Sequence, residues 1–522
     1  AAQLNLQRPS WQVEGQSSWL NSTSSTLNTS FWRPSLRLEK RFPQLDDWRI
    51  SLEAQAEKNE RRTPDSEELA PSSFYFQRYV AGLHSPEKET YQFGINYRQR
   101  RDFAPRATAF LASTLAHEGE VQGQWQPSAA WRSSGRLTYR ELQIRDSGLT
   151  DQTATKSLLG RVDVNANLWK GAVRSNATYE IGSGQEPRIE YTYLYVGAGQ
   201  GQYIWLDSLY NNDGKIQPNE MEIAPFPDIA DHVRVSIFTD EFIRTDNVTL
   251  NQNLQLDPSR LWRQPEPAWQ RTLSRFDWQS SLTINRKTRA FPGVQTWNPF
   301  QIELPDSALV ALTANQRHSL YFNRRSSIYD AQLEYTDLRN RLVPTTGFES
   351  RLRQTVTLRL RWNVTDAANL RLEAARTLRE SDSEFFNNKD YHLAGYQLRP
   401  ILTYQPGQDY RLSLEYLWQT EENELPDAGE GLSRHEVKVE GNYQRWFRVS
   451  VSSVQIDLAG DARSPVGFTL LNGLQPGSNW LWGASVTRQL GRFLQMTITY
   501  DGRKTGDAQA VHVGRAQVTA IF

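Results

Sequence analysis

An acidic segment near the middle of the chain has the clearest potential for chemistry. Asn211, Asp213 and Glu220 follow one another around Gly214. Calcium is a hard cation that takes several oxygen ligands, and an EF-type loop supplies them at alternate positions, with a glycine for the turn and a final bidentate glutamate. With Gly214 as the turn glycine, these residues fall at the third, fifth and twelfth positions of such a loop. The spacing therefore points to a calcium-binding loop.

The first ligand position departs from this pattern. It falls on Leu209, whose side chain cannot bind a cation, while Asp207 lies two residues earlier. Two interpretations are open: a calcium-bound loop that has gained two residues, or an Asn-Asp-Gly turn with solvated acids. In the first interpretation the ligands are Asp207, Asn211, Asp213 and Glu220. Calcium is the one cofactor that the sequence suggests.

A second group of candidate functional residues consists of arginines in the C-terminal half that alternate with apolar residues. They are Arg353, Arg359, Arg361, Arg371 and Arg411. Arginines that line a channel can make it selective for anions. They can equally pair with nearby acids, such as Glu373 and Glu415, and fill a closed interior. Both interpretations are open, and we favour the pairing.

Residue patterns for catalysis are missing. The seven histidines are scattered without zinc-ligand spacing, and the chain has no cysteine. It also lacks a nucleophile elbow and a phosphate-binding loop. We therefore expect no enzymatic activity.

The elements that must position these residues are strands, because residue types alternate with a period of two. Successive side chains of a strand point to opposite faces of the sheet. The clearest apolar sets are Tyr410, Leu412, Leu414, Tyr416 and Trp418, then Leu352, Val356, Leu358, Leu360 and Trp362, and near the start Trp48, Ile50, Leu52, Ala54 and Ala56. Polar residues stand between them, so each strand has one apolar and one polar face.

The composition suits a sheet that separates lipid from a wet interior. Only 38% of residues are hydrophobic, yet the chain has 17 Trp, 21 Tyr and 21 Phe. A membrane barrel needs apolar side chains at every second strand position only, and aromatic residues suit the headgroup boundary. The sequence therefore predicts an all-β fold, a single antiparallel transmembrane β-barrel over residues 1–522. With about 9–11 residues per spanning strand, we expect about 16–22 strands. A soluble sandwich or propeller is the alternative.

Connection lengths give an independent argument for a barrel. Counted backwards from Phe522, short and long connections alternate for six hairpins, as they do between periplasmic turns and extracellular loops. The alternation of side chains slips at Ser452-Ser453, which predicts a β-bulge. The last strand ends with Ala520 and Phe522, which resembles the signal that the barrel-insertion machinery reads.

Upstream, the pattern no longer fixes strand direction. Residues 287–316 are expected to form another long outer loop, and 256–270 are long for a periplasmic turn. Strands are expected over 158–167, 172–181 and 188–196. Residues 197–245 are expected to form an inserted acidic region that includes the EF-like loop. The first residues, Ala1-Ala2-Gln3, fit a chain that follows a removed leader or a piece of a longer one.

Three stretches resemble a group of largely uncharacterised outer-membrane β-barrel proteins of Bacteroidota. They are the stretch from Val466 to Trp482, which contains Gly-Leu-Gln-Pro-Gly-Ser-Asn-Trp, the ending from Tyr500-Asp-Gly-Arg-Lys-Thr-Gly to His512 and Phe522, and the region from Gly197 through Glu222 to Arg234. The resemblance implies a barrel and an outer-membrane location, but no known reaction. The displaced Asp207 departs from the plain acidic loop of the group.

The expected function is that of a structural or accessory subunit in a larger outer-membrane assembly, for secretion or surface-protein handling. The alternative is a passive pore or transporter for small solutes or anions, with the arginines in its lumen. The expected partners are outer-membrane lipid, the barrel-insertion machinery and other outer-membrane or surface proteins. Nucleic acid is not expected, because 59 basic and 59 acidic residues give no net charge.

Overall fold

The fold is described by a computed structural model. The residues described are 2–64, 66–262, 267–289, 291–305, 308–342, 348–384, 387–426, 428–444, 446–491 and 493–520, without the side chains of 185–189 and 238–242. Phe522, the residue expected to signal membrane insertion, lies outside the described residues. No helix in the described ranges has both the length and the apolar character needed to cross a membrane.

A single antiparallel sheet contains all 25 strands of the described residues. The first strands are β1 (Ala2–Arg8), β2 (Trp11–Thr23), β3 (Asn28–Phe42), β4 (Trp48–Arg62), β5 (Phe74–His84), β6 (Tyr91–Arg106), β7 (Ala109–Ser128), β8 (Trp131–Ile144), β9 (Thr155–Leu168) and β10 (Val173–Tyr195). Two short strands follow, β11 (Tyr203–Trp205) and β12 (Met221–Ile223). Each of the first nine strands pairs with the next in sequence, as in a simple meander.

The meander continues from β10 directly to β13, and β11 and β12 form a small hairpin beside this pair. The remaining strands are β13 (His232–Leu256), β14 (Phe276–Thr288), β15 (Leu309–Phe322), β16 (Tyr329–Leu342), β17 (Glu349–Asn363), β18 (Ala368–Ser383), β19 (Tyr391–Tyr404), β20 (Tyr410–Asn423), β21 (Gly431–Tyr443), β22 (Phe447–Ala459), β23 (Gly477–Gln489), β24 (Leu494–Thr505) and β25 (Val511–Ala520). Even without β11 and β12, the strands outnumber the roughly 16–22 expected.

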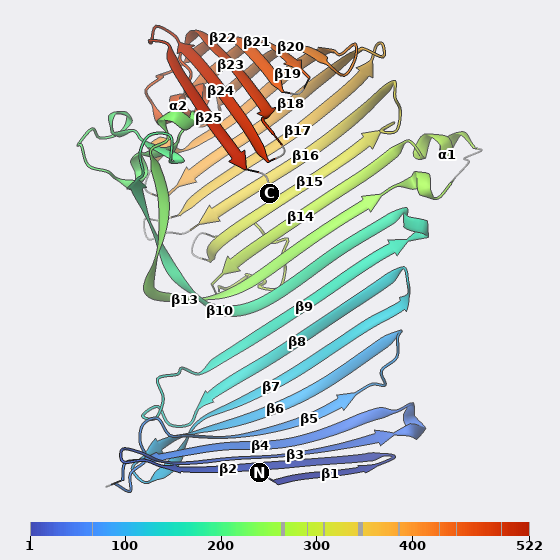
Figure 1. Cartoon of the computed structure of the whole chain (residues 1–522), viewed down its shortest axis with the longest axis vertical. Coiled ribbons are helices and arrows are strands. Elements are labelled where there is room, and N and C mark those ends of the chain that lie inside the picture. Colours follow the sequence, from blue (N-terminus) through green and yellow to red (C-terminus); the bar gives the residue numbers. More distant parts are fainter. Residues whose placement is uncertain are drawn as a thin grey trace.

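The sheet is strongly curved, and its C-terminal strands bend in front of the middle ones (Figure 1). Among the described residues, β1 pairs only with β2 and β25 only with β24, so the closure of a barrel is not formed between them. Because every neighbouring pair is antiparallel, β1 and β25 run in the same direction. A direct contact between these edges would be parallel, whereas the expected barrel was antiparallel throughout. The two edge strands, β1 and β25, therefore cannot pair in the antiparallel way that joins every other neighbouring pair of strands.

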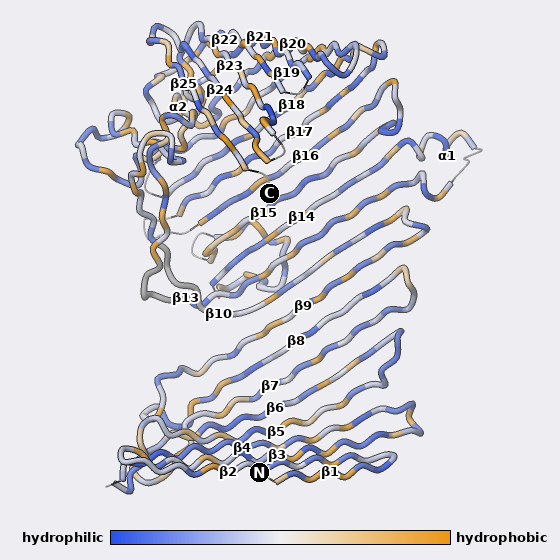
Figure 2. The backbone as a smooth tube through the Cα atoms, viewed as in Figure 1, coloured by the Kyte–Doolittle hydropathy of each residue, from blue (hydrophilic) through white to orange (hydrophobic). Residues whose placement is uncertain are grey.

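Hydrophobic and hydrophilic residues mix closely along the strands (Figure 2), as expected for a sheet with two different faces. Leu412 and Leu414, on the apolar face of β20, are 51% and 47% exposed. Leu52, on the apolar face of β4, is 49% exposed. Side chains on the opposite face of the same strands are mainly charged or amide residues. The apolar face is thus broadly exposed, while the polar face carries a helical segment described below.

The two ends of the sheet differ in their connections. At one end the turns are short, and they include 43–47, 169–172 and 490–493. The other end carries the long connections 196–231, 289–308 and 460–476. One connection at the short-turn end is longer, 257–275, which contains the helix α1 (Ala268–Leu273). The direction that the sequence left open is therefore fixed, and the acidic segment lies at the long-loop end.

Several expected boundaries change in this region. One strand, β10, spans two of the expected strands, 172–181 and 188–196, with a register shift between Pro187 and Ile189. The expected loop 287–316 is shorter, because β15 already begins at Leu309. The last part of the expected inserted region, from His232 onwards, belongs to β13. A continuous hairpin of β10 and β13 thus carries the acidic segment at its tip.

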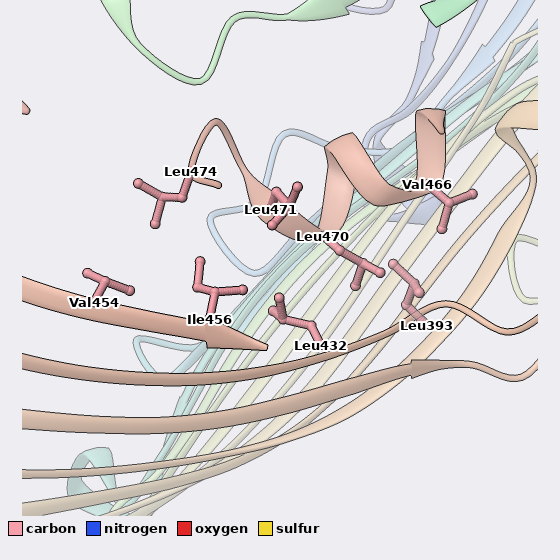
Figure 3. Close-up of a cluster of buried hydrophobic side chains, with 8 residues drawn as sticks. All are labelled: Leu393, Leu432, Val454, Ile456, Val466, Leu470, Leu471 and Leu474. Carbon is pink, nitrogen blue, oxygen red and sulfur yellow. The ribbon is translucent and has the colours of Figure 1, made fainter. Parts of the chain in front are cut away.

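A helix folds back over the polar face at the long-loop end. Four leucine and valine side chains of α2 (Pro465–Leu471) and the residues after it pack on the strands (Figure 3). The buried cluster consists of Leu393, Leu432, Val454, Ile456, Val466, Leu470, Leu471 and Leu474. The helix begins at Ser464, whose side chain accepts a hydrogen bond from the Gly467 amide at 2.9 Å.

This cluster explains the slip in alternation at Ser452-Ser453, and the expected bulge there is wrong. Strand β22 keeps continuous register with both neighbours. Val449 and Val451 are exposed on the apolar face, whereas Val454 and Ile456 are buried on the opposite one. The apolar residues change face because α2 covers the polar face at this point, so no extra residue is needed.

A second loop, 289–308, packs on the opposite, apolar face of the sheet near its long-loop end. Leu250, Ile284, Leu309, Leu312 and Ala314 form a buried cluster, with Ile302 and Leu304 of the loop 289–308 packed against it. Arg286 of β14 is fully buried and donates hydrogen bonds to the carbonyl oxygens of Gln301 at 2.6 Å and Gln295 at 2.8 Å. Its guanidinium thus fixes the loop through backbone acceptors, which need no particular side chain in the loop.

Candidate functional site

The polar face of β13–β25, here called the polar wall, carries charges that pair from strand to strand. Glu334 of β16 is largely buried and lies between Arg317 of β15 and Arg359 of β17, at nitrogen–oxygen distances of 2.6 and 3.3 Å. Its Oε2 also accepts hydrogen bonds from Ser319 at 3.3 Å and Gln332 at 3.1 Å. Charge-assisted bonds from both sides compensate the cost of burying this carboxylate.

The pairing continues through Glu373 of β18. This carboxylate is 3.8 Å from Arg359, 3.9 Å from Arg371 and 4.0 Å from Arg399 of β19. Arg399 also pairs with Glu415 of β20 at 3.3 Å. The result is a row of alternating charges that crosses six adjacent strands, from β15 to β20, and holds the arginines at fixed positions.

The five arginines singled out from the sequence therefore have different surroundings. Arg359 and Arg371 belong to this row, and Arg361 donates from Nε to Asp330 at 2.6 Å. Arg353 and Arg411 are exposed, and neither has an ion pair among the described residues. Arg353 lines a polar pocket beneath α2, together with Gln397 and Gln419. The wall thus combines charges that are neutralised with cations that are not.

A lobe formed by residues 196–231 lies against the C-terminal part of the polar wall. Asp228 of the lobe receives two hydrogen bonds, both of 2.7 Å, from the guanidinium of Arg503 in β24. The same guanidinium lies over the ring of Phe226, 4.2 Å from its centroid. The hydrogen bonds from Arg503 hold the pKa of the Asp228 carboxyl below its usual value, although partial burial opposes the shift. This bidentate pair fixes one side of the lobe.

The connection after α2 fits closely against the lobe. Gly473 has a φ of 80°, a conformation that strains other residues. A Cβ at this position would lie only 2.6 Å from Cγ of Pro225 and 2.8 Å from the ring of Phe226. Glycine is therefore required here both for the turn and for the close approach of the lobe.

A second contact joins the lobe to the 3-10 turn Asn387–Lys389 between β18 and β19. Lys389 is 2.7 Å from the Glu222 carboxylate and lies over the ring of Tyr210. The Tyr210 hydroxyl donates to Glu222 at 2.7 Å. Burial, with the nearby Glu222 carboxylate, raises the pKa of Tyr210, so the hydroxyl keeps its proton at neutral pH. Lys389 therefore contacts both the acidic segment and strand β12.

The acidic segment itself brings together three of its four candidate ligands. Oxygen atoms of Asp207, Asp213 and Glu220 all lie within 4.8 Å of one another. The amide oxygen of Asn211 accepts from the Asp213 backbone at 3.2 Å, inside the same loop. The structure thus places Asp207 beside the others in spite of its displaced position in the sequence.

The sequence did not single out the partners that organise this site. Glu334, Lys389, Asp228 and Arg503 are ordinary charged residues in their local sequence. The alternation of residue types in β16 puts Glu334 on the polar face. It does not show which arginines pair with it. Asp228 and Arg503 are separated by most of the C-terminal half of the sheet, so only the fold brings them together.

Comparison with known proteins finds only distant structural likeness. No protein-family model matches the chain, and no curated protein matches it. Solved structures similar to it include the ferric-catecholate import receptor Fiu from E. coli K12, with 11% identity, a TM-score of 0.31, and coverage of 95% of this chain and 77% of that one.

Two further structures show a similar degree of likeness. The siderophore receptor PiuA from Acinetobacter baumannii has 9% identity and a TM-score of 0.32, with 99% of this chain and 82% of that one covered. The outer membrane transporter YddB from Escherichia coli has 6% identity and a TM-score of 0.31, with 99% and 80% covered. TM-scores of this size do not establish a common fold, so the function is argued from the chain's own residues.

Proposed function

We propose that the chain is a bacterial outer-membrane β-barrel protein that lets polar solutes pass along its polar wall, with the lobe and α2 narrowing the outer end. The observation that carries this proposal is the difference between the two faces of the sheet. Apolar side chains are exposed on one face from β1 to β25, while α2 and the lobe lie on the polar face.

Lipid is the environment that such an apolar face fits. Exposed aliphatic and aromatic residues recur on strand after strand, among them Leu52, Ile95, Leu412 and Trp418. In water a continuous apolar surface of this extent would drive association. In a bilayer it faces the acyl chains, and the backbone groups are satisfied by the neighbouring strands. Closure of the two edges, which lipid also requires, is part of the proposal.

The polar wall favours transport over the accessory role that the sequence also suggested. A scaffold requires only an outer contact surface, whereas a row of charges along the inside suits a hydrated passage. Arg353 and Arg411 add positive charge that no described acid neutralises. The proposed solutes are therefore small and polar, with a preference for anions.

Conductance across planar bilayers tests this proposal. The purified chain should form a steady channel, and a variant in which a short Gly-Ser turn replaces residues 198–229 should conduct more, because the lobe no longer covers the wall. The double variant Arg353→Gln and Arg411→Gln should lose part of the anion preference, whereas the matched double variant Arg353→Lys and Arg411→Lys, which keeps both positive charges, should change it less. If neither the full chain nor the lobe-deleted variant conducts when inserted and folded, the proposal is wrong.

A further inference from the structure

The acidic cluster of the lobe contains a buried carboxylate oxygen that lacks a partner. The Glu220 side chain is 0% exposed. Its Oε2 accepts hydrogen bonds from the Trp205 indole at 2.8 Å and from the backbone amide of Gln217 at 3.2 Å. Its Oε1 has no hydrogen-bond partner. A buried carboxylate oxygen without a partner is costly, and a bound cation would compensate for it.

The fold of the loop brings Asp207 to the same place. The 3-10 turn Asp207–Leu209 shortens the path, and the Asn212 amide returns to the Asp207 carbonyl at 3.1 Å. The two carboxylate oxygens of Asp207 accept from the backbone amides of Asp213 at 3.0 Å and Gly214 at 2.9 Å. The two extra residues are thus absorbed in a turn, and Asp207 takes the place that a ligand at the first position of an EF-type loop would have.

The opposite side of the cluster is fixed by the short hairpin of β11 and β12. Trp205 pairs with Met221, and the Leu206 amide donates to the Glu220 carbonyl at 2.9 Å. This pairing sets the two ends of the acidic loop side by side. The Trp205 indole then holds the Glu220 carboxylate by its Oε2. The site is therefore built on a paired scaffold, and Glu220 cannot turn outwards to solvent without breaking it.

We propose that Asp207, Asp213 and Glu220, with the amide oxygen of Asn211, bind one calcium ion. All the ligand atoms are oxygen, and neither histidine nor cysteine takes part, which favours a hard cation over zinc or copper. Three carboxylates around an irregular loop suit calcium better than magnesium, since magnesium requires a near-octahedral shell and keeps its water. Ion binding offsets the mutual repulsion of the three acids.

The ion also stabilises the contact between the lobe and the polar wall. Tyr210 lies between Asp207 and Asn211 in the chain, and Glu222 follows Glu220 by two residues. Both Tyr210 and Glu222 contact Lys389, in the turn that joins β18 and β19 of the wall. A loop ordered by calcium thus presents the two groups that Lys389 binds. This role does not depend on what passes through the barrel.

Calcium titration of the chelator-treated full chain in detergent tests the site. We expect one equivalent to bind, with a dissociation constant on the order of 10⁻⁵ to 10⁻³ M, as for sensor and extracellular sites. Glu220→Gln and Asp213→Asn should each weaken binding at least tenfold. The matched control Asp231→Asn removes an acid of the same lobe that pairs with His232 outside the cluster, and it should bind calcium as the unchanged chain does.

Proteolysis gives a second readout, which reports the order of the loop and not calcium binding itself. Lys215 is exposed in the loop, and cleavage after it separates residues 1–215 from 216–522. Calcium should slow this cleavage by trypsin at least tenfold in the unchanged chain and in Asp231→Asn, but not in Asp213→Asn. Absence of saturable calcium binding by the unchanged chain would overturn the proposal. Equal binding of magnesium, or unchanged binding by both Glu220→Gln and Asp213→Asn, would overturn it as well.

Discussion

The N-terminal strands β1–β9 and the C-terminal strands β13–β25 share one residue pattern but differ in the segments that cover them. Both buried apolar clusters of the described residues lie on C-terminal strands, under α2 and under the loop 289–308. On the N-terminal strands the polar face is organised by cross-strand pairs such as Arg33 with Glu57 at 2.7 Å. The difference shows that loops at one end of a sheet can convert part of either face into a packed core.

The same comparison shows why the alternation of residue types fails in one region and holds in the other. Strand β4 alternates regularly from Trp48 to Ala56, and neither buried apolar cluster of the described residues includes a residue of this strand. Strand β22 changes pattern at Val454, where α2 begins to cover it. A local break in alternation is therefore a sign of a covering element as well as of a bulge.

The largest expected effect concerns the packing of α2. Ile456→Ala removes a side chain that is 1% exposed beneath the helix, and it should lower the free energy of unfolding by about 2–5 kcal/mol. The matched variant Val449→Ala changes the apolar face of the same strand, where the side chain is 39% exposed. Urea unfolding in detergent should show a clearly smaller loss for it. Equal losses would mean that α2 does not protect this part of the wall.

A smaller effect is expected for the row of charges. Glu334→Gln weakens bonds to Arg317 and Arg359 at once, so we expect a loss of about 1–3 kcal/mol in the same measurement. Glu57→Gln on the N-terminal strands removes one pair with the exposed Arg33, and its expected loss is below about 1 kcal/mol. A larger effect of Glu57→Gln would contradict the difference between the two regions.

The contact of the lobe with the wall should depend on pH. Since Arg503 lowers the pKa of the Asp228 carboxyl from 3.8, the pair stabilises the docked lobe above that pH and is lost as the pH falls through the lowered value. A spin label on Asn212→Cys, in a chain without native cysteine, should therefore become more mobile in acid below about pH 3.8.

The variant Asp228→Asn provides the control for this measurement. It should loosen the lobe at neutral pH, by about 1–2 kcal/mol, since the neutral amide accepts a weaker bond from Arg503. It should also remove most of the dependence on pH. Persistence of the full acid transition in this variant would assign the transition to another group.

The sequence by itself determined the strands, their two faces and the alternation of short and long connections. These features are local, because the period of two and the turn residues act within a few positions of each other. The candidate calcium ligands were also found from local spacing, although Asp207 did not fit the pattern until the turn Asp207–Leu209 was seen.

Only the tertiary structure decided which charges meet and which loops cover the wall. Arg503 and Asp228 pair across a long separation, and Lys389 reaches the acidic segment from another connection. The position of α2 could not be predicted because its apolar residues fit the outside or the inside of the sheet equally well by pattern. Charge pairs and packing between distant segments depend on the curvature of the whole sheet, which no short stretch of sequence encodes.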